Sequence, residues 1–219
     1  MRKAPLVTGH VYHVFNRGVN RQDIFFGKPD YKRFFEEAVH YKTKDNKFSY
    51  ERSFLGNDNE TGSLSLGRGA RVEILAYCLM PNHFHFLIRQ LEDGGITNYM
   101  RRLANGYAHY INVKYKRVGH LFTGRFKNVL IETDEQLLHV SRYIHLNPLV
   151  SGIVKDLKTF SFPSSYLSYL GENEDMLCGG GEVLRMFKSA EDYEKFVLDQ
   201  ADYGKKLEEM KHLLLDLEQ

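Results

Sequence analysis

A chain of 219 residues, 42% of them hydrophobic, is long enough to bury one hydrophobic core, and it contains no run approaching the roughly 18 apolar residues of a membrane span. Its two cysteines lie far apart, which argues against a disulfide framework or a zinc cluster. The net charge of +2 hides an asymmetry, because residues 1–130 carry +10 and residues 131–219 carry −8. The first part therefore suits a polyanionic partner.

The hydrophobic pattern predicts a regular order of strands and helices in the first part of the chain. The expected elements, in chain order, are a strand in HVYHVFNRG, a helix in KPDYKRFFEEAVHYKTK, strands in RVEILAYCLM and HFHFLIR, a long helix in ITNYMRRLANGYAHYINVKY and a strand in RFKNVLIE. A polar, glycine-containing loop insertion at 45–70 separates the first helix from the second strand. The order strand, helix, strand, strand, helix, strand is typical of ferredoxin-like α+β domains with an antiparallel sheet.

A further helix follows the last of these strands, in TDEQLLHVSRYIHLNPL. Thr133 and Gln136 form a capping-box signature at its start, and Asn147 before Pro148 marks its expected end. We expect residues 1–155 to form one domain. A C-terminal extension at 156–219 should be mostly helical.

The segment MPNHFHFLI raises the question of metal binding. In an extended strand His83 and His85 point to the same face, and two adjacent imidazoles suggest a metal site. On the capped helix His139, Tyr143 and Asn147 recur every four residues and form a polar stripe. If this stripe faced the histidines, the metal would have two imidazoles and an amide oxygen as ligands. A tyrosine nucleophile would then lie one helical turn away.

No acidic residue occurs between Gly94 and Ile131, although this segment is rich in lysine and arginine. The aromatic residues interleaved with these cations are Tyr99, Tyr107, Tyr110, Tyr115, Phe122 and Phe126. Cations for phosphates and rings for unstacked bases are typical of single-stranded nucleic-acid sites. A solvated basic helix with a core stripe is the alternative interpretation. The candidate DNA-binding residues are Arg17, Arg101, Arg102, Lys114, Arg117, Arg125 and Lys127.

Several motifs in order, HVFNRGVNRQDIFF, MPNHFHFLI, GHLFTGRFK, RYIHLNPLVSGIV and FPSSYLSYLG, resemble one known family. The chain is similar to the single-tyrosine HUH transposases of the IS200-like superfamily, in particular the REP-associated tyrosine transposases. The resemblance implies that His83 and His85 bind a divalent cation, Mg²⁺ or Mn²⁺, and that Asn147 completes the metal site. Imidazole ligands alone would favour zinc, nickel or manganese. Tyr143 matches the nucleophile of the family.

The implied activity is metal-dependent cleavage and rejoining of single-stranded DNA at hairpin, or palindromic, sites through a covalent 5′-phosphotyrosine intermediate. Because an ordinary tyrosine has a pKa near 10, the reaction needs a proton acceptor, for which His139 or a water on the metal are candidates. The implied location is the bacterial cytoplasm, with the nucleoid. Two alternatives remain, a non-cleaving binder of structured single strands and a nickase of the replication-initiator type.

The connection before the capped helix also bears on assembly. Little beyond Glu132 separates the preceding strand from Thr133, so the helix has little slack with which to reach another subunit. In a monomer or a homodimer, we therefore expect Tyr143 to act with the histidines of its own chain.

Overall fold

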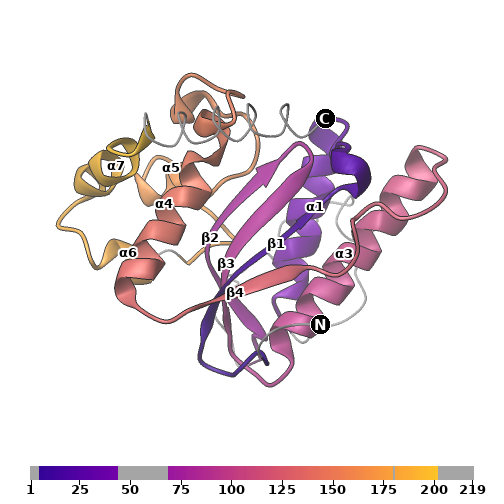
Figure 1. Cartoon of the computed structure of the whole chain (residues 1–219), viewed down its shortest axis with the longest axis horizontal. Coiled ribbons are helices and arrows are strands. Elements are labelled where there is room, and N and C mark those ends of the chain that lie inside the picture. Colours follow the sequence, from indigo (N-terminus) through magenta and orange to yellow (C-terminus); the bar gives the residue numbers. More distant parts are fainter. Residues whose placement is uncertain (1–4, 44–68, 180, 202–219) are drawn as a thin grey trace, which may run out of the picture.

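The computed structural model describes residues 5–43, 69–179 and 181–201 (Figure 1). Its sheet contains β1 (Val11–Arg17), β2 (Val72–Met80), β3 (His83–Gln90) and β4 (Lys127–Ile131) in the order β2-β3-β1-β4. All three pairings are antiparallel. The predicted α+β fold with an antiparallel ferredoxin-like sheet is thereby confirmed.

Two helices cover one face of this sheet, α1 (Lys28–Tyr41) and α3 (Gly95–Lys114) (Figure 1). They bury the apolar residues that alternate along the strands, because successive side chains of a strand point to opposite faces. The core on this side includes Tyr12, Val14, Phe34, Phe84, Phe86, Ile88, Leu103 and Tyr107. A short 3₁₀ helix, η1 (Val19–Arg21), follows β1.

The opposite face of the sheet is covered by α4 (Asp134–Val150) (Figure 1). The C-terminal extension packs around α4 and contributes to the same core. Its elements are η2 (Leu157–Thr159), α5 (Tyr166–Tyr169), α6 (Gly181–Leu184) and α7 (Ala190–Leu198). The core on this side includes Leu75, Cys78, Leu87, Leu137, Ile144, Tyr166, Tyr169 and Tyr193.

The start of α4 agrees with the sequence, but its end does not. The Thr133 hydroxyl accepts a hydrogen bond of 3.2 Å from the Gln136 amide, which confirms the predicted N-cap. The prediction that the helix ends at Asn147 and Pro148 is wrong, because α4 continues to Val150. Proline removes only its own N–H, and the Asn147 carbonyl still accepts a 3.0 Å bond from the Ser151 amide.

The ends of the polar insertion lie side by side. Thr43 and Ala70 form an isolated β-bridge, and the Arg71 amide donates to the Lys42 carbonyl at 2.7 Å. The insertion therefore leaves and rejoins the domain at one point. Most of the predicted 45–70 loop, and the last part of the extension after residue 201, lie outside the described residues.

Candidate active site

The two histidines of the HxH segment lie on the sheet face that α4 covers. The antiparallel register pairs His83 with Arg17 and His85 with Phe15, so these side chains share one face. His85 is 5% exposed, whereas the ring of Tyr143 on α4 is half exposed. The site is therefore buried at its histidine end and open at its tyrosine end.

The amide of Asn147 lies between the two imidazoles. Its Oδ1 is 3.4 Å from Nε2 of His83, and its Nδ2 is 3.4 Å from Nε2 of His85. Asn147 is one turn beyond Tyr143 on α4, and it is 9% exposed. The structure thus brings together the three residues that the sequence suggested as metal ligands.

Asn82, read in the sequence only as a turn residue, determines which nitrogen of His83 carries the proton. Its Nδ2 donates to the Arg21 carbonyl at 3.1 Å, which orients the amide so that Oδ1 faces Nδ1 of His83 at 2.5 Å. Because this oxygen can only accept, the Nδ1 of His83 must be the donor. Its Nε2 then presents a lone pair to the Asn147 oxygen.

His13 on β1 is a third histidine in the site, and the sequence analysis missed it. Its Nε2 lies 2.9 Å from Nδ1 of His85. Burial lowers the pKa of His13 to about 4. The pKa of His85 is far below its ordinary value, first through burial and then through the nearby charges of His83, His13 and Arg17. Both rings are neutral at pH 7, the form in which imidazole binds metals.

These residues fit a divalent cation. In the described part of the chain no three His, Cys, Asp or Glu side chains form a metal-binding group, so the set depends on the Asn147 amide. Ligand atoms at about 2.0–2.1 Å from an octahedral ion lie about 3 Å apart, close to the 3.4 Å between Nε2 of His83 and Oδ1 of Asn147. Nε2 of His83 and Nε2 of His85 both face the Asn147 amide. Asn82 and His13 contact the Nδ1 atoms of the same two rings, as expected around metal-bound histidines.

The ring of Tyr143 packs against this histidine cluster of the same chain. Its centroid lies 5.4 Å from that of His85 and 5.9 Å from that of His13, with the rings nearly perpendicular. The three rings line a pocket of about 510 Å³. Tyr143, His83 and His85 therefore line a common space large enough for a phosphodiester group.

His139 does not share this position. Its Nε2 lies 3.7 Å from Glu135, and Arg142 donates to its Nδ1 at 2.5 Å. The side chain is about half exposed on α4. The histidine rings that contact Tyr143 are therefore those of His85 and His13, not that of His139.

Three of the seven candidate DNA-binding residues line the same pocket, Arg17, Arg125 and Lys127. They come from β1, from the segment before β4 and from β4 itself, so only the folded chain collects them. A fourth residue, Arg101, lines a separate groove along α3, to which Arg125 also contributes. Cations thus surround the space in front of Tyr143.

The other three candidates have partners on the opposite side of the sheet. The guanidinium of Arg102 lies over the ring of Tyr41, and that of Arg117 over the ring of Phe26, at 5.9 and 5.8 Å from the centroids. Lys114 is ion-paired with the fully buried Asp30 at 2.6 Å. Each of these cations therefore contacts an aromatic ring or a carboxylate of its own chain.

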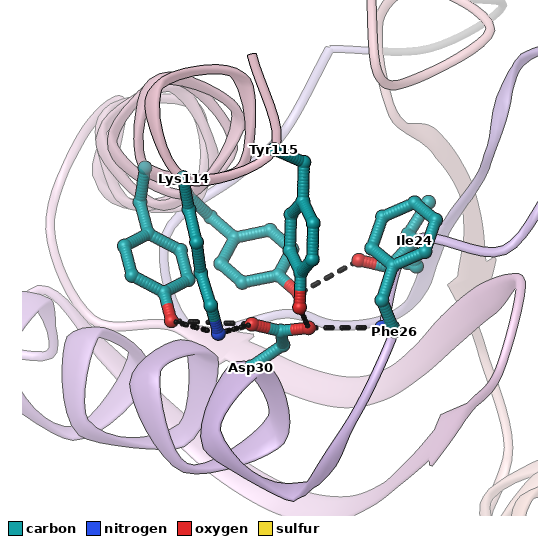
Figure 2. A network of polar contacts seen from close by, with 7 residues as sticks. Ile24, Phe26, Asp30, Lys114 and Tyr115 are labelled. Atoms are coloured by element: carbon teal, nitrogen blue, oxygen red, sulfur yellow. Dashed lines mark hydrogen bonds and ion pairs between the residues drawn. The ribbon is translucent and has the colours of Figure 1, made fainter. Parts of the chain in front are cut away.

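Figure 2 shows the network around Asp30. Besides Lys114, its carboxylate accepts hydrogen bonds from the Tyr115 hydroxyl at 2.7 Å, the Phe26 amide at 2.9 Å and the Tyr110 hydroxyl at 3.1 Å. Burial alone would raise the pKa of Asp30, but the ion pair with Lys114 and the hydrogen bonds from Tyr115 and the Phe26 amide lower it below its ordinary value. The network ties the start of α1 to the end of α3.

Burial also corrects the interpretation of the aromatic residues. Tyr99 and Tyr107 are fully buried, and Phe122 is 7% exposed, all in the core beneath α1 and α3. A role in stacking on bases is wrong for Tyr99 and Tyr107, because no face of these rings is accessible, whereas Phe122 lines the groove along α3. The core stripe that the alternative interpretation required is present in α3.

Comparison with known proteins finds one similar solved structure and one matching family model. A solved structure of a REP-associated tyrosine transposase bound to a REP hairpin has a similar fold, with a TM-score of 0.56 at 17% identity over 84% of this chain and 92% of that protein. Residues 64–147 match the family described as Transposase IS200 like. This range includes His83, His85, Tyr143 and Asn147, and the match confirms the resemblance seen in the sequence.

No curated relative matches the chain significantly. In the part of the chain that the structure describes, no helix has the length and apolarity needed to cross a membrane. The family match supports a transposase-type function, and the solved structure shows the shared fold.

Proposed function

We propose that this protein is a metal-dependent transposase that cleaves and rejoins single-stranded DNA through a covalent bond to Tyr143. One observation carries the proposal. The half-exposed Tyr143 ring packs on His85, and both face a pocket that also contains Arg17, Arg125 and Lys127. A nucleophile, metal ligands and phosphate-binding cations are the groups that phosphodiester transesterification needs.

Each residue of the site has a defined role in this proposal. His83, His85 and Asn147 would hold a divalent cation, magnesium or manganese, which supplies a Lewis acid for a non-bridging phosphate oxygen. Asn82 and His13 would keep the two imidazoles in the required tautomers. The pocket cations would bind the flanking phosphates and orient the strand.

The chemical step conserves the number of phosphodiester bonds. The phenol oxygen of Tyr143 attacks phosphorus, and the bond from phosphorus to the 3′ oxygen breaks. The 5′ phosphate stays on the tyrosine, while the departing strand gains the proton and ends in a 3′ hydroxyl. Because one ester replaces another, a 3′ hydroxyl can attack the phosphotyrosine and rejoin the DNA.

We further propose that the substrate contains a DNA hairpin and that each chain uses its own tyrosine. The hairpin is suggested by the structurally similar transposase, which was solved with one bound. The short connection through Glu132 and the packing of Tyr143 on His85 favour a site within one chain.

The test is covalent capture on a single-stranded hairpin oligonucleotide with magnesium or manganese, resolved on a denaturing gel. We expect the wild-type chain to form an adduct and Tyr143→Phe to form none. Tyr115→Phe, the same change at an exposed ring beyond the other face of the sheet, should retain the adduct. An equal adduct from Tyr143→Phe would refute the nucleophile. Hairpin binding by the wild type without any adduct would indicate the non-cleaving binder instead.

A further inference from the structure

A groove of about 1010 Å³ runs between α3 and the segment 119–126. Its floor is apolar, with Met100, Ala104 and Leu121, and amide and imidazole side chains such as Asn105 and His120 lie along it. None of the described residues that line it is acidic. The groove therefore combines an apolar surface with hydrogen-bonding groups and a positive potential.

The wall opposite α3 is held in place by bonds to the end of β1. The Val19 amide donates to the Leu121 carbonyl at 3.0 Å, and the Thr123 hydroxyl donates to the Gly18 carbonyl at 2.9 Å. Nδ2 of Asn16 donates to the Gly124 carbonyl at 3.0 Å. These bonds, all within the chain, fix this wall of the groove to the end of β1.

The groove and the Tyr143 pocket are neighbours, because Asn16 and Arg125 line both. We propose that the groove binds the unpaired DNA strand that adjoins the cleaved phosphodiester. This inference rests on the proposed function, since it takes the pocket as the place where a single strand is cut. It adds the path of that strand across the protein, along α3.

The chemistry of the lining favours an unpaired strand over a duplex stem. A stem hides its base faces and presents mainly phosphates, whereas an unpaired strand exposes base faces and edges. Ala104, Ala108 and Phe126, which are partly exposed, offer apolar contact to bases, and the Asn105 amide can bond to base edges. Arg101 and Arg125 supply charge for the phosphates.

Two adjacent arginines provide a matched pair for the test. Arg101 lines the groove, and its guanidinium bonds to the neutral amide of Asn98 at 2.9 Å. Arg102 is not part of the lining, and its guanidinium lies over the ring of Tyr41. Both variants remove one positive charge from the same turn of α3, so only their positions differ.

The experiment measures binding of the full chain to two labelled DNAs by fluorescence anisotropy at several salt concentrations. One DNA is a hairpin with single-stranded flanks, and the other is the same hairpin without flanks. We expect Arg101→Ala to weaken binding of the flanked DNA about 5–10-fold and to reduce its salt slope by about 1. Arg102→Ala should change either affinity by less than about 2-fold.

Asn105→Asp provides a second test, because it places a negative charge in the groove without changing the shape of the side chain. It should weaken binding of the flanked DNA and leave the bare hairpin unaffected. Equal losses for Arg101→Ala and Arg102→Ala, or equal losses on both DNAs, would overturn the proposal. If the variants change binding as expected but the wild-type chain forms no covalent adduct, the proposed function alone is refuted. If the wild-type chain forms the adduct but these variants bind DNA as the wild type does, the groove alone is refuted.

Discussion

The protein contains two clusters of polar side chains on opposite sides of its sheet, and they differ in the length of their contacts. Around Asp30, one carboxylate receives a lysine, two tyrosine hydroxyls and a backbone amide at 2.6–3.1 Å. Around Asn147, the amide meets two imidazole nitrogens at 3.4 Å each. The contacts of the first cluster are short. In the second cluster the amide and the two imidazoles face one another at longer distances.

This difference separates a structural cation from the candidate active site. Sequence alone made Lys114 a candidate for DNA, yet its charge is needed to balance a carboxylate that is fully buried. His83 and His85 instead face a pocket that opens to solvent beside Tyr143. The Asp30 network, with its short hydrogen bonds inside the protein, stabilises the fold. The side chains of His83, His85 and Asn147, with their longer contacts, are positioned to bind a ligand.

The largest expected effect concerns the open cluster. His83→Ala or His85→Ala should lower single-strand cleavage by about 10³-fold or more, because the charge stabilisation supplied by a metal is lost. Binding of hairpin DNA should stay within a few-fold of the wild type. His139→Ala, which removes an exposed histidine of α4, is the control and should cleave normally. Cleavage at the wild-type rate by either site variant would show that these imidazoles do not hold the metal.

The closed cluster should respond in stability. Lys114→Met leaves the buried Asp30 carboxylate without its cation, and we expect the free energy of unfolding in urea to fall by about 2–4 kcal/mol. Arg101→Met, on the exposed side of the same helix, should change it by less than about 0.5 kcal/mol. If both variants were equally stable, Lys114 would be as available for DNA as Arg101, and the comparison of the two clusters would fail.

A smaller effect should come from the residue that supports His83. Asn82→Ala removes the oxygen that fixes the Nδ1–H tautomer, so we expect Mn²⁺ affinity, measured by electron paramagnetic resonance, to fall about 10–100-fold. Asn82→Asp keeps an acceptor at this position and should retain most of the affinity. Unchanged Mn²⁺ binding by Asn82→Ala would mean that His83 is oriented by other contacts.

The order of the elements followed from the sequence, because local patterns reflect local geometry. Strand alternation placed His83 and His85 on one face, and the four-residue helical spacing placed Asn147 one turn from Tyr143. The cap at Thr133 was also predicted from a pattern of four residues. The proline after Asn147 misled the prediction of the helix end, since a single missing N–H does not outweigh the packing of the last turn of α4.

The sequence alone was thus enough to predict the order of strands and helices, the shared face of the two histidines and the spacing of Tyr143 and Asn147. The tertiary structure alone decided which other residues meet them. His13 reaches His85 across 72 positions, and Asn82 reaches the Arg21 carbonyl across 61. Strand pairing and helix packing create such contacts, and the periodic pattern of the sequence does not reveal them. The same packing buries Tyr99 and Tyr107 and pairs Lys114 with the carboxylate of Asp30.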